Sequence, residues 1–86
     1  MPRDPGISFS EQALRVLLSC RRLARERLLR EVERLLAHWN EPAALTVRDG
    51  TGRELNVSLL PPFSITWWLH PVDWEIRILH IEIIRS

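Results

Sequence analysis

The first half of the chain carries apolar residues at a helical period. Neither Gly nor Pro occurs between residues 10 and 40, and the apolar positions there recur at spacings of three and four residues. They are Leu14, Leu17, Leu18, Leu28, Val32, Leu35, Leu36 and Trp39. Ser10 is placed to cap the first helix. One unbroken helix would be about 45 Å long, more than the width of a compact domain of this size. We therefore predict a helical hairpin that breaks near residues 19–23.

The second half changes to an alternation of apolar and polar residues, which is typical of half-buried strands. The alternation covers residues 45–47, 55–59, 63–67 and 75–84. The segments between these strands contain Gly or Pro and are short enough for hairpin loops. The pattern predicts an antiparallel meander of three to four strands.

The helical stripe and the one-sided sheet together predict the fold class, because burying one apolar surface against the other is the standard two-layer arrangement. We predict a single α+β domain over residues 1–86, with a helical hairpin at residues 10–40 packed on one face of an antiparallel sheet at residues 45–84. Whether the N-terminus adds a strand stays open, because the prolines and Gly6 in that segment disfavour one.

A register between the predicted strands sorts their side chains into two faces, because directly opposite residues share a face. We align Val47 with Leu55, Leu59 with Phe63, Val57 with Ile65, Leu55 with Trp67, Trp67 with Ile78, and Leu69 with Ile76. These residues then form the core. The outer face carries Trp68 beside Arg77, and Leu79 and Ile81 follow along the last strand.

Trp67 and Trp68 are adjacent, so in a strand they point to opposite faces and one of them lies outside the main core. Trp68 opposite Arg77 is expected to form a cation–π pair. Two interpretations stay open. The pair simply covers the outer face, or Trp68, Leu79 and Ile81 form a partner-binding surface, since Trp and Arg are frequent interface anchors. A second copy of the chain fits such a surface as well as a foreign protein does.

The charge is nearly balanced, with 12 basic residues, all Arg, against 11 acidic residues, for a formal net charge of +1. This balance argues against a nucleic-acid-binding domain held by phosphate contacts. Seven Arg and four Glu lie between residues 10 and 40, which gives that half a net charge of +3. Within it, Arg21, Arg22 and Arg25 are candidate anion-binding residues. The alternative is a solvated helix face with neighbouring Glu–Arg pairs.

Little else in the sequence indicates chemistry. The single Cys20 excludes an internal disulfide and fits a reducing compartment, and no apolar run is long enough for a membrane span, so we expect a soluble cytoplasmic protein. His38, His70 and His80 are too far apart in sequence for a local metal motif. No phosphate-binding loop, nucleophile elbow or dinucleotide motif occurs. We therefore expect no metal site, no cofactor and no locally encoded catalytic site.

Three segments of the chain resemble the RelE/ParE toxin superfamily. They are Gly52–Val57 (GRELNV), Phe63–Trp67 (FSITW) and Glu75–Ile81 (EIRILHI), and they follow the predicted helical hairpin. The resemblance spans about residues 10–84. It implies the fold of that family and a small bacterial toxin that is neutralised by an antitoxin encoded beside it. Such toxins are either ribosome-dependent mRNA endonucleases or gyrase inhibitors.

The resemblance also implies roles for individual residues. Arg53 matches the Arg of the family's second-strand motif, whereas Ser64 stands where an Arg is expected and Trp67 where a Tyr is expected. These departures remove groups that would position RNA, activate the 2′-hydroxyl and protonate the leaving oxygen. We therefore expect a family member that acts by protein binding, either gyrase-inhibitor-like or non-catalytic, with Arg53 among its partner-binding residues.

Two other functions stay open at this point. One is a non-toxic structural or regulatory module that homodimerises through the sheet face bearing Trp68 and Leu79. The other is a ribonuclease that uses Arg53, Arg77 and His80. A neighbouring reading frame for a small protein with a DNA-binding end and a disordered tail would favour the toxin, and the absence of such a frame would favour the non-toxic module.

Overall fold

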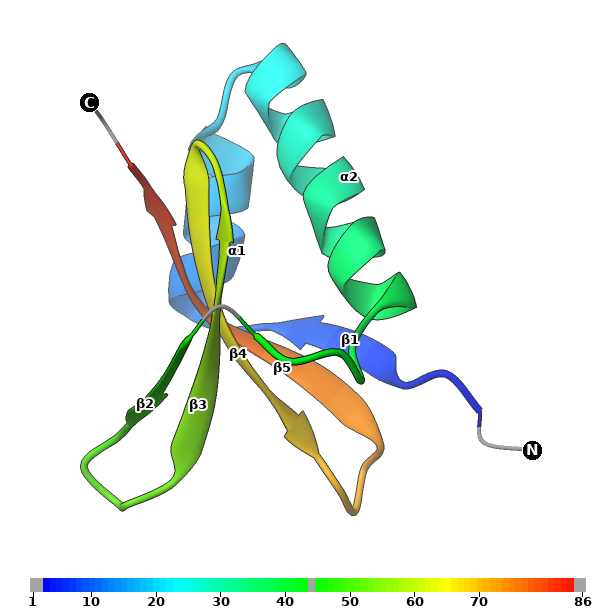
Figure 1. The fold of residues 1–86 in the computed structure, drawn as a ribbon. Helices are drawn as coiled ribbons and strands as arrows, with labels where there is room; N and C mark the ends of the chain where they lie inside the picture. Colours follow the sequence, from blue (N-terminus) through cyan, green and yellow to red (C-terminus); the bar gives the residue numbers. More distant parts are fainter. Residues whose placement is uncertain (1–2, 44, 85–86) are drawn as a thin grey trace.

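The computed structural model describes residues 3–43 and 45–84, and these contain two helices and five strands (Figure 1). In chain order they are β1 (Gly6–Phe9), α1 (Glu11–Ser19), α2 (Arg22–Ala37), β2 (Leu45–Arg48), β3 (Glu54–Leu60), β4 (Phe63–His70) and β5 (Glu75–Ile83). The α+β class is therefore as predicted, with a pair of helices that precedes a meander of strands.

Local sequence sets the bounds of the helical hairpin. Ser10 caps α1, and its side-chain oxygen accepts a hydrogen bond from the Ala13 amide at 3.1 Å. The hairpin breaks at Cys20, inside the predicted segment. The Arg25 guanidinium secures the break by donating to carbonyls at the end of α1, those of Leu17, Leu18 and Cys20. These bonds satisfy carbonyls that have no partner within the helix.

The sheet is mixed and has the strand order β1-β5-β4-β3-β2, which corrects the predicted antiparallel sheet of three to four strands. β2 to β5 form an antiparallel meander, whereas β1 pairs in parallel with β5. Gly6 lies opposite Glu75, and Phe9 lies opposite Ile78. Pro5 comes directly before β1, so its missing amide does not interrupt the pairing.

The register of the β3–β4 hairpin differs by one residue from the predicted one. Leu60 pairs with Phe63, because the turn between the strands consists of Pro61 and Pro62 and does not include Leu60. A slip of one residue moves every side chain of a strand to the opposite face. The apolar side chains of β3 at Val57 and Leu59 therefore lie on the outer face, and their predicted place in the core is wrong. Leu55 lies on the same face and is buried, at 8% exposed, but outside the main core cluster.

A β-bulge in β5 changes the face of its second half. Trp67 pairs with Ile78, but the register shifts at the next step, so Thr66 pairs with His80. Leu79 is the extra residue. Beyond it Ile81 returns to the core, where it is 1% exposed. The prediction that Ile81 lies on the outer face is wrong for this reason.

Where β1 ends, side chains at the start of α1 form hydrogen bonds with the backbone of the β5 edge. The Ser10 hydroxyl donates to the Leu79 carbonyl at 2.6 Å. The Gln12 side-chain amide donates to the Ile81 carbonyl at 3.1 Å and accepts from the Ile81 amide at 3.0 Å. The side chains of the N-cap residue Ser10 and of Gln12 in α1 thus replace the hydrogen bonds that a longer β1 would supply to the bulged strand.

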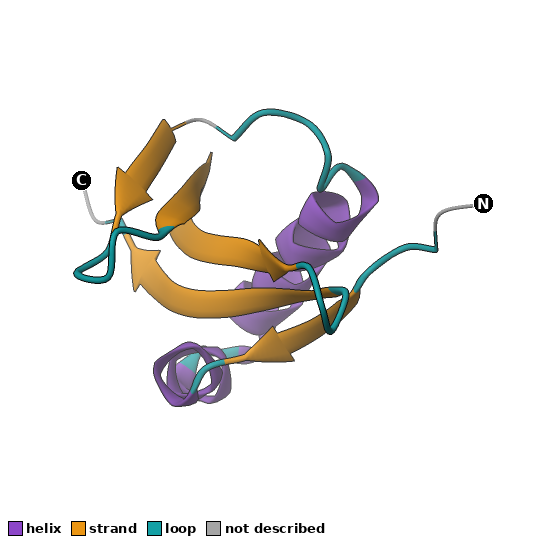
Figure 2. Ribbon diagram, turned by 90° about the horizontal axis from the view of Figure 1, so that it is seen from below, coloured by secondary structure: helices purple, strands orange, loops and turns teal. Residues whose placement is uncertain are grey.

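The core lies between the two helices and one face of β4 and β5. Its large, fully buried side chains are Leu28, Phe63, Ile65, Ile76, Ile78 and Ile81. Trp67 belongs to the same cluster and is 4% exposed, as its predicted place in the core requires. The sheet is strongly curved (Figure 2). Its outer face is the one that points away from the core and carries Trp68 on β4.

Candidate functional site

The outer face is organised around Trp68. The Arg53 guanidinium lies over the Trp68 ring, 4.3 Å from its centroid, and the His70 ring meets the indole edge-on at a centroid distance of 5.1 Å. Arg77 is the neighbour of Trp68 on β5, as predicted. However, the cation–π partner of Trp68 is Arg53, which directly precedes β3, and not Arg77.

The indole nitrogen of Trp68 is buried and has no hydrogen-bond partner among the described residues. A buried donor without an acceptor costs roughly 1–3 kcal/mol of folding stability. Trp67, one residue earlier, instead donates its indole N–H to the Ser58 hydroxyl at 2.9 Å. The two adjacent indoles therefore differ in their contribution to folding, and Trp68 is the one kept at a cost in stability.

Arg77 is held by two carboxylates on the same face. Its Nε donates to Glu75 at 3.1 Å, and its guanidinium also donates to Asp73 at 2.5 Å. The Ser8 hydroxyl of β1 donates to Glu75 at 2.9 Å. This hydrogen bond, followed by the one from Arg77, lowers the pKa of Glu75 below its ordinary value. Arg77 is therefore held by one acid of its own strand and one acid of the turn before it.

Arg53 is likewise paired with a carboxylate. Its Nε lies 3.3 Å from Asp49 in the β2–β3 loop. The pKa of Asp49 is lowered, first by the hydrogen bond from the Thr51 hydroxyl and then by backbone amides of the same loop. The loop thus fixes the acid that holds Arg53 over the indole.

A row of apolar side chains continues the outer face across β3 to the edge strand β2. Leu45, Val47 and Leu59 are between 42% and 47% exposed, and Val57 is half-buried. We call Leu45, Val47, Val57 and Leu59 the outer strip. The predicted register assigns Val47, Val57 and Leu59 to the core, because alternation shows which residues share a face but does not show which face the helices cover.

The remaining candidates from the sequence lie in different environments. Leu79 is half-buried at the bulge. His80 is exposed opposite Thr66, and its Nε2 lies 3.5 Å from Glu82. The sheet therefore brings Arg53, Trp68 and Arg77 together, and it leaves Ile81 out of that group.

The three candidate anion-binding arginines lie at the turn between the helices. Arg21 occupies the N-cap position of α2, Arg22 pairs with Glu26 at 3.3 Å, and Arg25 donates to the end of α1. The guanidiniums of Arg22 and Arg25 are thus engaged inside the hairpin. Anion binding by this group stays a prediction.

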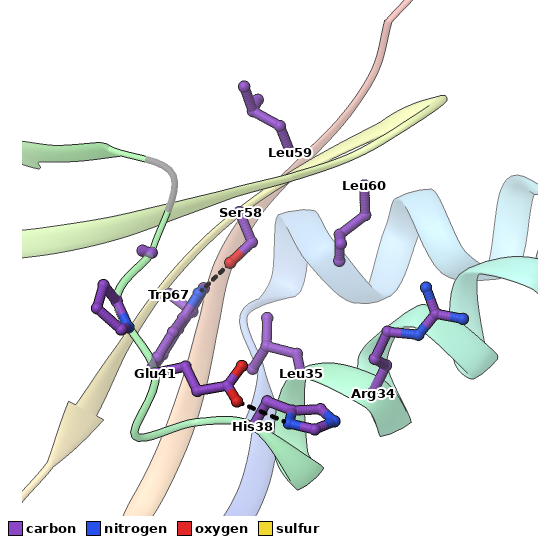
Figure 3. A pocket seen from close by; sticks show the side chains of 10 residues that line it. Arg34, Leu35, His38, Glu41, Ser58, Leu59, Leu60 and Trp67 are labelled. Atoms are coloured by element: carbon purple, nitrogen blue, oxygen red, sulfur yellow. Dashed lines mark hydrogen bonds and ion pairs between the residues drawn. The ribbon is translucent and has the colours of Figure 1, made fainter.

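A hollow of about 240 Å³ lies between the end of α2 and the β3–β4 hairpin (Figure 3). Leu35, Leu60 and the Trp67 indole line it, and Leu59 lies at its rim. Arg34 and the hydrogen-bonded pair of His38 and Glu41 supply charged or polar groups around it. No motif in the sequence indicated this hollow, because its residues come from separate elements.

The described residues contain no helix long and apolar enough to cross a membrane. Within the same residues, no three His, Cys, Asp or Glu side chains are grouped so that they could hold a metal ion. Cys20 is buried as a free thiol at the end of α1.

Comparisons with known proteins relate the chain to one fold. No protein-family model matches it, and no curated protein matches it. A chain of the archaeal RelE–RelB complex from Pyrococcus horikoshii OT3 superposes with a TM-score of 0.70 at 14% identity, over 94% of this chain and 96% of that one. The isolated E. coli RelE toxin gives a TM-score of 0.71 at 13% identity, over 95% of this chain and 86% of that one.

A chain of the intact E. coli RelBE toxin-antitoxin complex gives a TM-score of 0.60 at 10% identity, over 95% of this chain and 99% of that one. The likeness thus extends over nearly the whole chain in all three comparisons. The protein has a RelE-like fold, which is the fold that the resemblance of its three segments implied.

Proposed function

We propose that this protein is the toxin of a toxin–antitoxin pair and that it acts by binding a protein, in a gyrase-inhibitor-like or otherwise non-catalytic way. The observation that carries the proposal is the RelE-like fold over 94–95% of the chain, shared with structures described as a RelE toxin and as complexes with RelB. An antitoxin-like protein is the partner that this fold favours.

The pairing of charges on the outer face supports protein binding over RNA cleavage. Arg53, Arg77 and His80 each lie beside a carboxylate, at 3.3, 3.1 and 3.5 Å respectively. A phosphate would have to compete with these acids for the same donors. The net charge of +1 also provides little general attraction for RNA.

The surface that we assign to the protein partner centres on Trp68, with Arg53 over its ring and Arg77 beside it on β5. A large aromatic ring stacked with an arginine is the composition found at interface anchors. The indole nitrogen of Trp68 has no hydrogen-bond partner among the described residues, which lowers the folding stability of the isolated chain. Arg53, Trp68, Arg77 and Leu79 are therefore our partner-binding residues, and the outer strip extends the surface toward β2.

Co-purification with the product of the neighbouring reading frame tests this assignment. We expect a stable complex whose dissociation constant rises at least tenfold in Trp68→Ala. Leu23→Ala is the matched control, because Leu23 is an apolar residue of α2 that is 80% exposed. Unchanged affinity in Trp68→Ala, or an equal loss in Leu23→Ala, would contradict the assignment of the surface.

A homodimer through the outer face is the second candidate function, and the exposed outer strip favours it. Contiguous exposed apolar residues on a small domain mark contact surfaces. Sedimentation analysis across a hundredfold range of concentration separates the two candidates. A toxin that awaits its partner stays monomeric, whereas a regulatory module that pairs through this face forms a dimer that Val47→Glu dissociates.

A further inference from the structure

One imidazole connects the outer face to the turn between β4 and β5. His70 is the last residue of β4, and its Nδ1 accepts a hydrogen bond from the Asp73 amide at 3.1 Å. The proton of the neutral ring therefore lies on Nε2, because one nitrogen of a neutral imidazole accepts and the other donates. The same ring meets the indole of Trp68 edge-on. His70 thus contacts both the turn and the residue at the centre of the outer face.

The Asp73 carboxylate lies between two side chains. Its Oδ2 accepts from the Arg77 guanidinium at 2.5 Å and lies 3.8 Å from Nδ1 of His70. Both of these last two atoms are acceptors while the ring is neutral, so no hydrogen bond joins them. Asp73 therefore presents its amide to His70 and its carboxylate to Arg77.

Protonation of His70 changes this arrangement. A charged imidazole donates from both nitrogens, so Nδ1 loses the Asp73 amide and requires an acceptor. The turn places the Asp73 carboxylate beside it, and a charge-assisted hydrogen bond brings the two atoms from 3.8 Å to about 2.8 Å. The carboxylate then moves away from Arg77, which keeps its hydrogen bond to Glu75.

The charged groups around the ring come from three parts of the sheet. They are Asp73 of the turn, Glu75 and Arg77 of β5, and Arg53 before β3 with its acid Asp49. Three carboxylates thus face two guanidiniums, which gives the group a net charge of −1 while His70 is neutral. A proton on the ring brings this charge to zero, so the outer face becomes less negative.

The end of the same turn is under backbone strain. Trp74 has a φ of +52°, a conformation that bulky side chains rarely adopt. Its carbonyl accepts from the Gly6 amide at 3.0 Å, and its ring packs edge-on against Trp39 at a centroid distance of 5.2 Å. Strain of this kind persists only while the surrounding contacts enforce it. Loss of the hydrogen bond between His70 and the Asp73 amide removes one restraint on the neighbouring residue, so the turn becomes free to rearrange.

We propose that His70 is a pH-sensitive switch of the outer face: protonation at Nδ1 exchanges the Asp73 amide for the Asp73 carboxylate and withdraws that carboxylate from Arg77. Imidazole is the side chain whose charge ordinarily changes between pH 5 and 8. The exchange is a property of the isolated chain. Its regulation of a partner rests on the proposed function, because Arg77 belongs to the surface assigned to that partner. With one acid withdrawn, Arg77 binds a carboxylate of the partner more strongly.

An NMR titration of the isolated chain between pH 8 and pH 5 tests the switch. The spectra follow the ring nitrogens of His70, the amide and carboxyl carbon of Asp73, and the guanidinium of Arg77. At pH 8 we expect the ring proton on Nε2. As the ring becomes charged, the Asp73 and Arg77 signals should move with the same midpoint as those of His70.

His70→Asn is the decisive variant, because its side-chain oxygen accepts from the Asp73 amide but does not titrate. The pH-dependent movement of the Asp73 and Arg77 signals should fall at least fivefold. His80→Asn is the matched control, since it removes an imidazole beside Glu82, and it should leave the movement unchanged. A ring proton on Nδ1 at pH 8, Arg77 signals that do not follow His70, or movement that persists in His70→Asn would overturn the proposal.

The complex with the product of the neighbouring reading frame tests the regulation separately. Its dissociation constant should fall at least threefold from pH 8 to pH 5.5, and His70→Asn should abolish this change. A chain that shows the exchange but binds no such product keeps the switch and loses the proposed function. A chain that binds the product equally at both pH values keeps the proposed function, and the regulation by His70 is then wrong.

Discussion

Trp67 and Trp68 show how far the environment of one residue depends on its face of the sheet. Trp67 is 4% exposed, packs in the core and donates to Ser58, whereas Trp68 lies under Arg53 with its own indole nitrogen unpartnered. Alternation along a strand is sufficient to predict that the two rings point to opposite faces. It does not predict the cation that covers Trp68, because Arg53 comes from the loop before β3.

The two rings should respond differently to truncation. Trp67→Ala should lower the free energy of unfolding by about 3–5 kcal/mol, because it empties the core. Trp68→Ala should lower it by only about 1–2 kcal/mol, since a half-exposed ring and an unsatisfied donor are lost together. Urea unfolding followed by circular dichroism measures both values. Equal losses would show that the faces are assigned wrongly.

Glu75 should titrate below its ordinary pKa of 4.5, because Ser8 and Arg77 donate hydrogen bonds to the carboxylate. Since the pKa is lowered in the folded state, the stabilisation is present above pH 4.5 and is lost as the pH falls through the folded-state pKa. Carbonyl-detected NMR titration should place the Glu75 midpoint below 4.5, and Ser8→Ala should raise it.

Ser64→Ala is the control for that titration, because Ser64 lies opposite Glu82 near the other end of β5. It should leave the Glu75 midpoint in place. A Glu75 midpoint that does not move in Ser8→Ala would show that the hydroxyl is not what lowers the pKa.

At the scale of elements, the junction of α1 with the bulge of β5 depends on one amide side chain. Gln12→Ala leaves both backbone groups of Ile81 without their partners, so we expect a loss of roughly 1–3 kcal/mol. Hydrogen exchange should then report faster exchange of the Ile81 amide. Glu11→Ala is the control, because it removes only an exposed pair with Arg15, which contributes at most about 1 kcal/mol.

The elements also show where prediction from the sequence succeeds and where it fails. The helical hairpin and its break near Cys20 follow from periodicity and from the helix cap at Ser10. The register of β3 on β4 does not, because it depends on whether Leu60 belongs to the turn or to the strand. That single residue decides that Val57 and Leu59 face outward, so the outer strip could not be found from the pattern alone.

The sequence alone leaves strand β1 open, because proline and glycine near the N-terminus are poor strand residues. The structure satisfies the backbone of β1 from β5, with the Gly6 amide bonded to the Trp74 carbonyl at 3.0 Å and the Ser10 amide bonded to the Ile78 carbonyl at 2.8 Å. Parallel pairing of segments about seventy residues apart leaves no local signal in the sequence.

At the scale of the whole molecule, the order of the elements is more informative than any motif. No family model matches the sequence, yet the chain superposes on RelE structures at 10–14% identity over nearly its full length. The fold could therefore be predicted from loose aliphatic patterns, because burial tolerates many exchanges among apolar residues. The candidate site could be predicted only in part, since Arg53, Trp68 and Arg77 meet through the register of three strands.

Growth of a bacterial host after tightly controlled induction of this chain alone tests the central claim most directly. We expect arrest, which co-expression of the neighbouring reading frame reverses, while total RNA shows no new cleavage products. Arrest should be retained in His80→Ala if no RNA chemistry is involved. Unimpaired growth with abundant soluble protein would contradict the toxin assignment and favour a module that pairs through its outer face.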